Sequence, residues 1–200
     1  MRRFLFTALT AIVVFSAVAQ SYTLNDLLNG KFSPRGVRPM VSSHDGQHYY
    51  QTDPQQTAVI KYAYTSGEAV DTLFSTRTAR SCPFDSFEGF EVSPDENRVL
   101  LYREREQIYR HSFRARYYYH DVRRNMVRKL SEQPSKQLIP VFSPDSKMVA
   151  YVIDNNIWLT KFDFDTESQV TKDGELNKVI NGATDWVYDC LLYTSDAADE

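Results

Sequence analysis

Apolar and polar positions alternate along much of the chain, and the apolar runs recur at a regular spacing. Turns of the type Ser-x-Asp begin at Ser43, Ser93 and Ser143, so successive turns start fifty residues apart. Each turn leads into a run rich in β-branched, aromatic or aliphatic residues. Proline presets φ in such turns, and aspartate bonds its own backbone two residues on. The pattern therefore predicts a β-sheet unit that is repeated every fifty residues.

Further strands are expected around the turns. Apolar alternation predicts strands at 57–64, 69–74, 98–102, 116–121, 126–130, 148–152 and 156–159. The segment 65–68 is rich in turn-forming residues and closes a predicted hairpin. Helical character is confined to two short segments: 24–28, which Thr23 can cap, and the stretch around 185–188.

A period near fifty residues with several strands per unit is typical of a β-propeller, in which each unit is one blade. The expected fold class is all-β, an incomplete β-propeller of about three blades. Chance recurrence of a common turn is the alternative. Because a propeller closes with roughly four to eight blades, three repeats describe an open arc. We therefore expect residues 20–189 to fold poorly or to aggregate when expressed alone.

The N-terminal segment 1–19 has the organisation of a secretory signal peptide. Arg2 and Arg3 supply a basic start, residues 4–18 are mostly apolar, and Ala17-Val18-Ala19 forms a small-x-small cleavage pattern. The apolar segment is shorter than the roughly 20 residues of a membrane span, and an uncleaved N-terminal anchor is the alternative. The protein is therefore expected to be exported, to the periplasm or to the outer surface.

The C-terminal segment 190–200 differs in character from the rest. Its sequence, CLLYTSDAADE, resembles the translation of a transposase-type sequencing adapter, so we interpret it as a non-native tail; a genuine acidic tail is the alternative. In that reading frame, Asp189 can stand where the gene encodes glutamate. Cys190 belongs to this tail and is not expected to pair with Cys82.

Composition narrows the possible functions. An apolar content of 42% and an aromatic content of 14% suffice for a packed core, and a net charge of −3 argues against a general nucleic-acid binder. Basic residues are frequent between Arg103 and Lys129, with tyrosines at 117–119. Such a stretch can contact nucleic acid, but its alternation favours solvent-facing strand positions. No nucleic-acid partner is expected.

Motifs for chemistry within the chain are missing. The sequence has no Gly-x-Ser-x-Gly elbow, no His-Glu-x-x-His or Cys-x-x-Cys motif, no P-loop and no dinucleotide-binding fingerprint. Cys82 precedes a proline and is interpreted as a loop thiol. His44 and His48 flank a predicted turn and are not expected to bind a metal. We expect no catalytic residue, metal or cofactor in this chain.

Several motifs resemble, in order, those of the dipeptidyl peptidase IV family. They are TLNDLLNGKF (23–32), YRHSF (109–113), VFSPD (141–145), VAYV (149–152), NNIW (155–158) and NGATDWVY (181–188). The resemblance spans roughly residues 22–189. It implies an eight-bladed N-terminal propeller followed by a C-terminal α/β-hydrolase domain. That domain, which this chain would lack, carries the Ser/His/Asp triad and releases N-terminal dipeptides with Pro or Ala in second position.

The resemblance also assigns two substrate-binding residues. Arg110 matches the propeller arginine that hydrogen-bonds a substrate carbonyl, a role that suits a guanidinium with several fixed donors. The alternative is an arginine that pairs with an acid on a neighbouring strand. Asp189 falls at the first position of a glutamate run that holds the free α-ammonium of the substrate. The acids that follow in the family are replaced here by Cys190 and Leu191.

The functional prediction follows from this family. The chain is expected to be the substrate-gating and N-terminus-binding propeller part of an exported serine exopeptidase that releases Xaa-Pro and Xaa-Ala dipeptides. Its expected partners are peptides with free N-termini and the C-terminal hydrolase domain, and a homodimer of the full-length protein remains open. The alternative is a secreted β-propeller that binds a partner and has no enzymatic activity.

Overall fold

The structure, a computed structural model, describes residues 23–33 and 38–185, which belong to two separate units. The described part of the first unit holds the short helix α1 (Leu24–Leu28). Thr23 caps it: the Thr23 side chain accepts a hydrogen bond from the Asp26 N–H, and the Asp26 carboxylate accepts one from the Thr23 N–H, both 3.1 Å long. This confirms the predicted helix and its cap. The helix expected around 185–188 lies outside the described residues, apart from Asp185, which is not helical.

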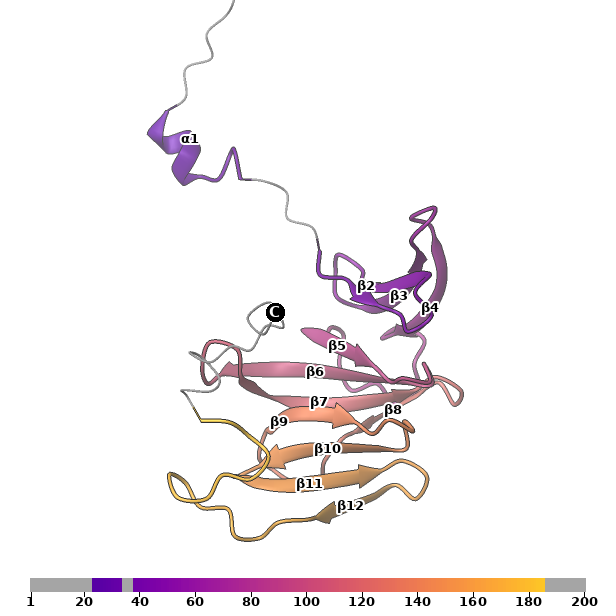
Figure 1. Ribbon diagram of the computed structural model, residues 1–200. Helices are drawn as coiled ribbons and strands as arrows, with labels where there is room; N and C mark the ends of the chain where they lie inside the picture. The colour runs from indigo at the N-terminus through magenta and orange to yellow at the C-terminus, as the bar shows by residue number, and fades with distance from the viewer. Residues whose placement is uncertain (1–22, 34–37, 186–200) are drawn as a thin grey trace, which may run out of the picture. The chain divides into compact units, whose positions relative to one another are not determined.

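Residues 38–185 of the second unit form three consecutive antiparallel meanders of four strands each, the last two joined in one eight-stranded sheet (Figure 1). The first contains β1 (Val41–Ser42), β2 (His48–Thr52), β3 (Ala58–Ala63) and β4 (Ala69–Ser75). The second contains β5 (Gly89–Val92), β6 (Arg98–Gln107), β7 (Phe113–Asp121) and β8 (Met126–Lys129). The third contains β9 (Gln137–Phe142), β10 (Met148–Ile153), β11 (Asn156–Lys161) and β12 (Thr166–Gln169). The predicted all-β fold with several strands per repeat is confirmed.

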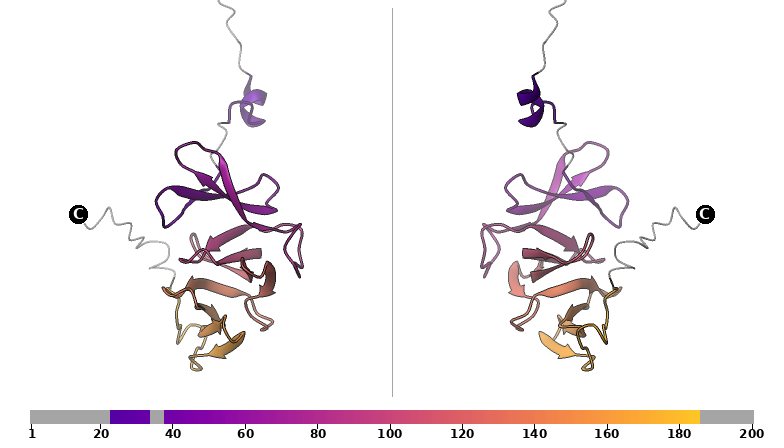
Figure 2. Two further views of the ribbon diagram at one scale, coloured as in Figure 1. Left: turned by 90° about the vertical axis from the view of Figure 1, so that its right-hand side faces the viewer. Right: turned by 90° about the vertical axis from the view of Figure 1, so that its left-hand side faces the viewer.

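The three meanders follow one another in space as they do in sequence (Figure 2). A short pairing of β7 with β9, at Arg114 with Leu138 and Ala115 with Gln137, joins the second meander to the third. Within the described residues, no helix has the length and apolar character that a membrane crossing requires.

The Ser-x-Asp turns repeat in backbone geometry as well as in sequence. Their fourth residues, Gly46, Glu96 and Ser146, all have a left-handed backbone, with φ of 67°, 57° and 58°. In each turn the N–H of this residue donates to the carbonyl of the first serine, over 3.2, 2.9 and 2.8 Å. The fifty-residue repeat of the sequence therefore corresponds to a repeated backbone conformation.

The same fourth positions connect neighbouring meanders. The Glu96 carboxylate accepts a hydrogen bond of 2.7 Å from the Ser43 hydroxyl, one repeat earlier. It also forms a 2.7 Å ion pair with Lys61. The Ser146 hydroxyl accepts a 3.1 Å hydrogen bond from the Asp95 N–H, again one repeat earlier. Each turn thus contacts the turn before it.

Strand β6 contributes to two hydrophobic cores because its side chains alternate between the two faces of the second meander. Leu101 is buried in a core that it shares with the first meander, including Val59 and Phe74. Leu100 points to the other face and is buried with Val149 and Tyr151 of the third meander. The middle meander is therefore covered on both faces.

Candidate functional site

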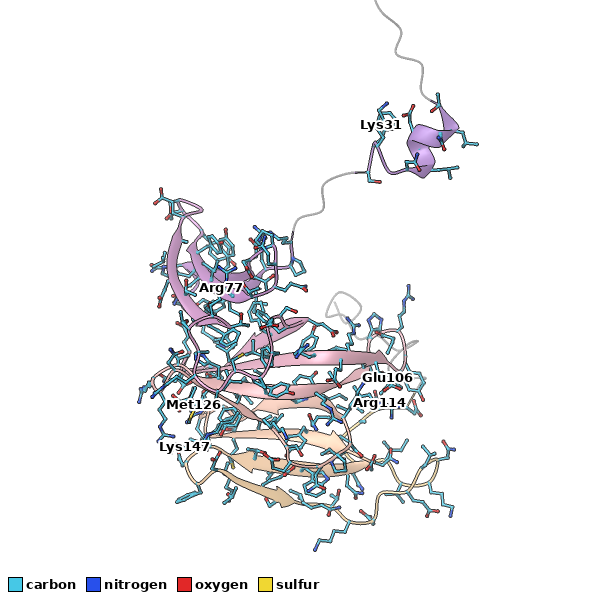
Figure 3. All side chains as sticks on the ribbon, turned by 180° about the vertical axis from the view of Figure 1, so that it is seen from behind. Lys31, Arg77, Glu106, Arg114, Met126 and Lys147 are labelled. Atoms are coloured by element: carbon cyan, nitrogen blue, oxygen red, sulfur yellow. The ribbon has the colours of Figure 1, made fainter. Side chains whose placement is uncertain are left out.

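The β6–β7 hairpin is longer than the sequence predicted. The apolar runs indicated strands at 98–102 and 116–121, whereas the structure continues pairing outward to Gln107 and Phe113. Strand β5 pairs with β6 only as far as Tyr102, so the outer part of the hairpin extends beyond it. Figure 3 shows Glu106 and Arg114 side by side in this outer part, far from Met126 and Lys147 at the other end of the strands.

Ion pairs stabilise this extension. The Glu106 carboxylate is 2.6 Å from the Arg114 guanidinium and 3.6 Å from the Lys136 ammonium. The bond with Arg114 is the main cause that lowers the pKa of Glu106. Arg116 pairs with Glu104 over 3.3 Å. Arg114 and Arg116 of the basic stretch are therefore paired with acids of the same hairpin.

Gln107 holds the loop 108–112 at the hairpin tip. Its side-chain amide donates to the carbonyls of Tyr109, Arg110 and Ser112, over 3.2 Å for the last two. The Arg105 guanidinium in turn donates to the Gln107 amide oxygen over 2.7 Å. These bonds fix the path of the backbone on both sides of Arg110.

Arg110 is exposed at this tip. Among the basic residues from Arg103 to Lys129, it is the one whose side chain has no ion pair, hydrogen bond or ring contact with the described part of the chain. The others contact the acids or aromatic rings described above, Phe84, Asn97, Asp121, Glu132 or Asp165. The alternative expectation, an arginine paired with an acid on a neighbouring strand, fits Arg114 and Arg116 but not Arg110.

Aromatic rings pack beneath the loop. The ring of Tyr102 is 5.1 Å from that of Phe113 and 5.5 Å from that of Tyr117, measured between centroids. Tyr102 lies across Gly89, its cross-strand partner, where an added Cβ would come within 2.6 Å of ring carbon Cε1. The Arg105 guanidinium covers Phe113 at 4.3 Å. The glycine leaves room for the ring that supports the hairpin base.

A half-open cavity of about 210 Å³ lies between these rings and strand β9. Its lining includes Glu91, Tyr102, His111, Ser112, Phe113 and Tyr117. Two polar groups there stand out: the Glu91 carboxylate, which has no partner in the described part of the chain, and the Ser112 hydroxyl, which is shielded from solvent and makes no hydrogen bond. Glu91 is exposed as a residue, and partial desolvation beside the rings raises the pKa of its carboxyl group.

The structure says less about Asp189 and about the cysteine and histidines considered in the sequence. Asp189 lies outside the described residues, as do the predicted signal peptide and the tail 190–200. Cys82 donates a 3.2 Å hydrogen bond to the Phe84 carbonyl, and burial raises the pKa of its thiol. His48 contacts Asp45 at 2.6 Å. Residues 23–33 and 38–185 hold no group of three His, Cys, Asp or Glu arranged for a metal ion.

Sequence reasoning found Arg110 through its motif but missed the residues around it. Glu91 lies in a strand that the sequence did not predict, and its place at the cavity depends on the pairing of β5 with β6. Gln107 carries no signal in the sequence either, because its role depends on carbonyls that only the folded loop brings together.

Comparisons with known proteins identify the family and the relatives that the chain resembles. The family model described as the dipeptidyl peptidase IV N-terminal region matches residues 93–197. Human prolyl endopeptidase FAP is 32% identical over 170 residues, 85% of this chain and 21% of that protein. Dipeptidyl-aminopeptidase B of Aspergillus niger is 38% identical over 107 residues, 52% of this chain and 12% of that protein.

The crystal structure of Porphyromonas gingivalis dipeptidyl peptidase 4 superposes with a TM-score of 0.80 at 52% identity, over 84% of this chain and 24% of that chain. The matched part of that structure lies in its β-propeller region, in agreement with the three meanders. The chain thus spans about a fifth of the length of FAP and about a quarter of the bacterial structure.

Proposed function

The chain belongs to the dipeptidyl peptidase IV family, and from this we propose that it is the peptide-binding propeller part of an exported serine exopeptidase. In this proposal the propeller selects and orients peptide N-termini. A Ser/His/Asp triad on a C-terminal α/β-hydrolase domain then releases Xaa-Pro and Xaa-Ala dipeptides by acylation and hydrolysis. Export follows from the predicted signal peptide.

The unpaired guanidinium of Arg110 is the observation that carries the proposal. Its neighbours are held by Gln107 and by ion pairs, whereas its own donors point at no described acceptor. A fixed backbone with an unused guanidinium suits a group that hydrogen-bonds a peptide carbonyl. Asp189 is proposed to contribute to binding the substrate α-ammonium, because an amine that leaves water needs a compensating charge.

The test is the peptidase activity of the full gene product that contains this chain. With Ala-Pro-p-nitroanilide as substrate, we expect Arg110→Ala to lower kcat/KM about 10- to 100-fold, since a hydrogen bond to a charged group contributes about 1.5–3 kcal/mol. Arg110→Lys is expected to restore part of the loss, because lysine keeps the charge but not the planar donor pair.

Arg77→Ala is the matched control. Arg77 is also exposed, has no side-chain partner in the described residues, and lies in the first meander after β4 (Figure 3). Its kcat/KM is expected to equal that of the wild type. Wild-type kcat/KM in Arg110→Ala would remove Arg110 from the proposal. A folded full-length product that cleaves no Xaa-Pro or Xaa-Ala peptide would instead support the binding-module alternative.

A further inference from the structure

The cavity beside the Arg110 loop holds a carboxylate on an otherwise apolar face. On strand β5, Gly89 and Glu91 share a face, opposite Tyr102 and Leu100 of β6. Leu100 is 1% exposed and belongs to the core shared with the third meander. Glu91 itself is exposed, so its carboxylate is accessible from solvent at the rim of this half-open cavity.

Glu91 has no described partner, and the cations of the β6–β7 hairpin are engaged by other groups. Arg105 is engaged by Phe113 and Gln107, Arg114 and Lys136 pair with Glu106, and Arg116 pairs with Glu104. The hairpin therefore leaves one exposed cation, Arg110, and one carboxylate, Glu91, without a described partner. The loop residue Ser112 joins the two features, because it follows Arg110 closely in the chain and lines the cavity with Glu91.

The cavity has the composition of a cation site. Its walls include the rings of Tyr102, Phe113 and Tyr117, whose faces attract positive charge. Burial, and then the charges of Tyr102 and Glu91, raise the pKa of Tyr117, so the carboxylate acts on this wall. Ser112 offers a further oxygen that has no partner. A volume of about 210 Å³ accommodates one long side chain but no folded ligand.

We propose that this cavity is a specificity subsite that binds one basic side chain of the peptide, with Glu91 as counter-ion and the tyrosine rings around its alkyl stem. The inference rests on the proposed function for the identity of the ligand as a peptide. Arg110 holds the peptide backbone beside the subsite. The charged group of a lysine or arginine side chain then pairs with Glu91, and its methylene groups cover the apolar wall.

The test is peptide binding to the full gene product that contains this chain, measured by isothermal titration calorimetry. The serine of the proposed triad is replaced by alanine, so that the peptides are not cleaved. The probes are Ala-Pro-Ala-Ala peptides with lysine, norleucine or glutamate placed in turn at the first, third and fourth positions. Norleucine keeps the alkyl stem of lysine and removes the charge. At one position we expect lysine to bind about fivefold or more tightly than norleucine, and Glu91→Gln to remove that preference.

Two further variants keep the result interpretable. Glu68→Gln removes a carboxylate from the β3–β4 turn and is expected to retain the lysine preference. Glu91→Lys reverses the charge and is expected to favour the glutamate peptide, which a loss of fold would not produce. Equal binding of lysine and norleucine peptides by the protein that retains Glu91, or an unchanged preference in Glu91→Gln, overturns the proposal.

Acetylated peptides distinguish the two sources of an ammonium group. If Nα-acetylation abolishes the effect of Glu91 and lysine substitution does not change it, the carboxylate binds the peptide N-terminus and the side-chain assignment is wrong. The readout is binding, so it does not depend on catalysis. A full gene product that binds lysine peptides in this way but, with its serine intact, cleaves no Xaa-Pro bond contradicts the proposed function alone.

Discussion

Gly89 and Tyr102 form a cross-strand pair in which the absence of one side chain makes room for the other. The Tyr102 ring lies across the glycine and contacts Phe113, which itself begins the strand after the Arg110 loop. Aromatic cover of a glycine in this way stabilises a strand pair that lacks a side chain on one side. The ring thus supports the base of the hairpin and one wall of the cavity.

We expect Gly89→Ala to destabilise the protein by about 1–3 kcal/mol, because the new Cβ forces the Tyr102 ring from its place. Urea unfolding measures the free energy of unfolding. In a Tyr102→Ala background the same substitution is expected to cost little, since the colliding ring is gone. Equal costs in both backgrounds would show that the ring does not set the requirement for glycine.

His120 is 2% exposed and packs 5.0 Å from the Phe74 ring, between the first and second meanders. Its Nε2 contacts Asn125 Oδ1 at 3.1 Å. Burial lowers the pKa of His120 below its ordinary 6.5, against smaller opposing effects of Asn125 and Asp121. As pH falls, the unfolded chain therefore takes up a proton before the folded protein does.

This predicts a loss of stability in mild acid. The contribution of neutral His120 is complete above about pH 6.5 and is lost as pH falls toward the folded-state pKa, by at most about 1.4 kcal/mol per pH unit. Urea unfolding at pH 7 and pH 5 measures the change. His120→Gln should flatten this dependence, and His44→Gln, at an exposed turn position, should not. A pH dependence that His120→Gln leaves intact would assign it to other groups.

At the scale of elements, the turns connect the repeats. Ser146 is 1% exposed, and its hydroxyl accepts the Asp95 N–H of the preceding turn. Ser146→Ala is expected to lower the free energy of unfolding by about 1 kcal/mol, because it leaves that partly buried N–H without its acceptor. Ser66→Ala is the control, since Ser66 accepts a bond only within its own exposed turn. Equal small losses in both would mean that the link between turns adds no stability.

The strands that the sequence did not predict have identifiable causes. β5 contains Gly89 and Glu91, which interrupt the apolar alternation. β9 contains Pro140 and, at Ile139, a left-handed residue with φ of 50°, so its pairing with β10 is irregular. β12 (Thr166–Gln169) is entirely polar and makes its described pairing on one side, with β11. Their conformation depends on the neighbouring strands and not on their own composition.

The candidate site was predictable only in part, for similar reasons. The motif around Arg110 identified the residue. Its guanidinium lacks a described partner because the acids of the hairpin pair with other basic residues, which the sequence does not show. The sequence shows arginines and glutamates close together between Arg103 and Arg116. Which of them pair follows from the register and the bulge between Arg103 and Glu106.

At the scale of the whole β unit, the meanders form a series in which each shares a core only with its neighbours. Leu101 is 0% exposed in the core with the first meander, and Leu100 is 1% exposed in the core with the third. In arrays of this kind, stability is approximately a sum of unit and nearest-neighbour contributions. The expectation that residues 20–189 fold poorly alone stays a prediction, and a sharp cooperative melt of a monomer would contradict it.

The adjacent leucines of β6 allow a direct test of this serial arrangement. Each alanine substitution is expected to cost about 2–5 kcal/mol, because each leaves a cavity in a packed core. Hydrogen exchange measured by segment locates the effect. Leu101→Ala should speed exchange in β2–β4 and in the second meander, and leave β10–β11 near the wild type. Leu100→Ala should do the reverse, with β2–β4 unchanged. Uniformly faster exchange over all three meanders in both variants would mean that the unit opens as a single cooperative body, and that the shared strand couples its two cores completely.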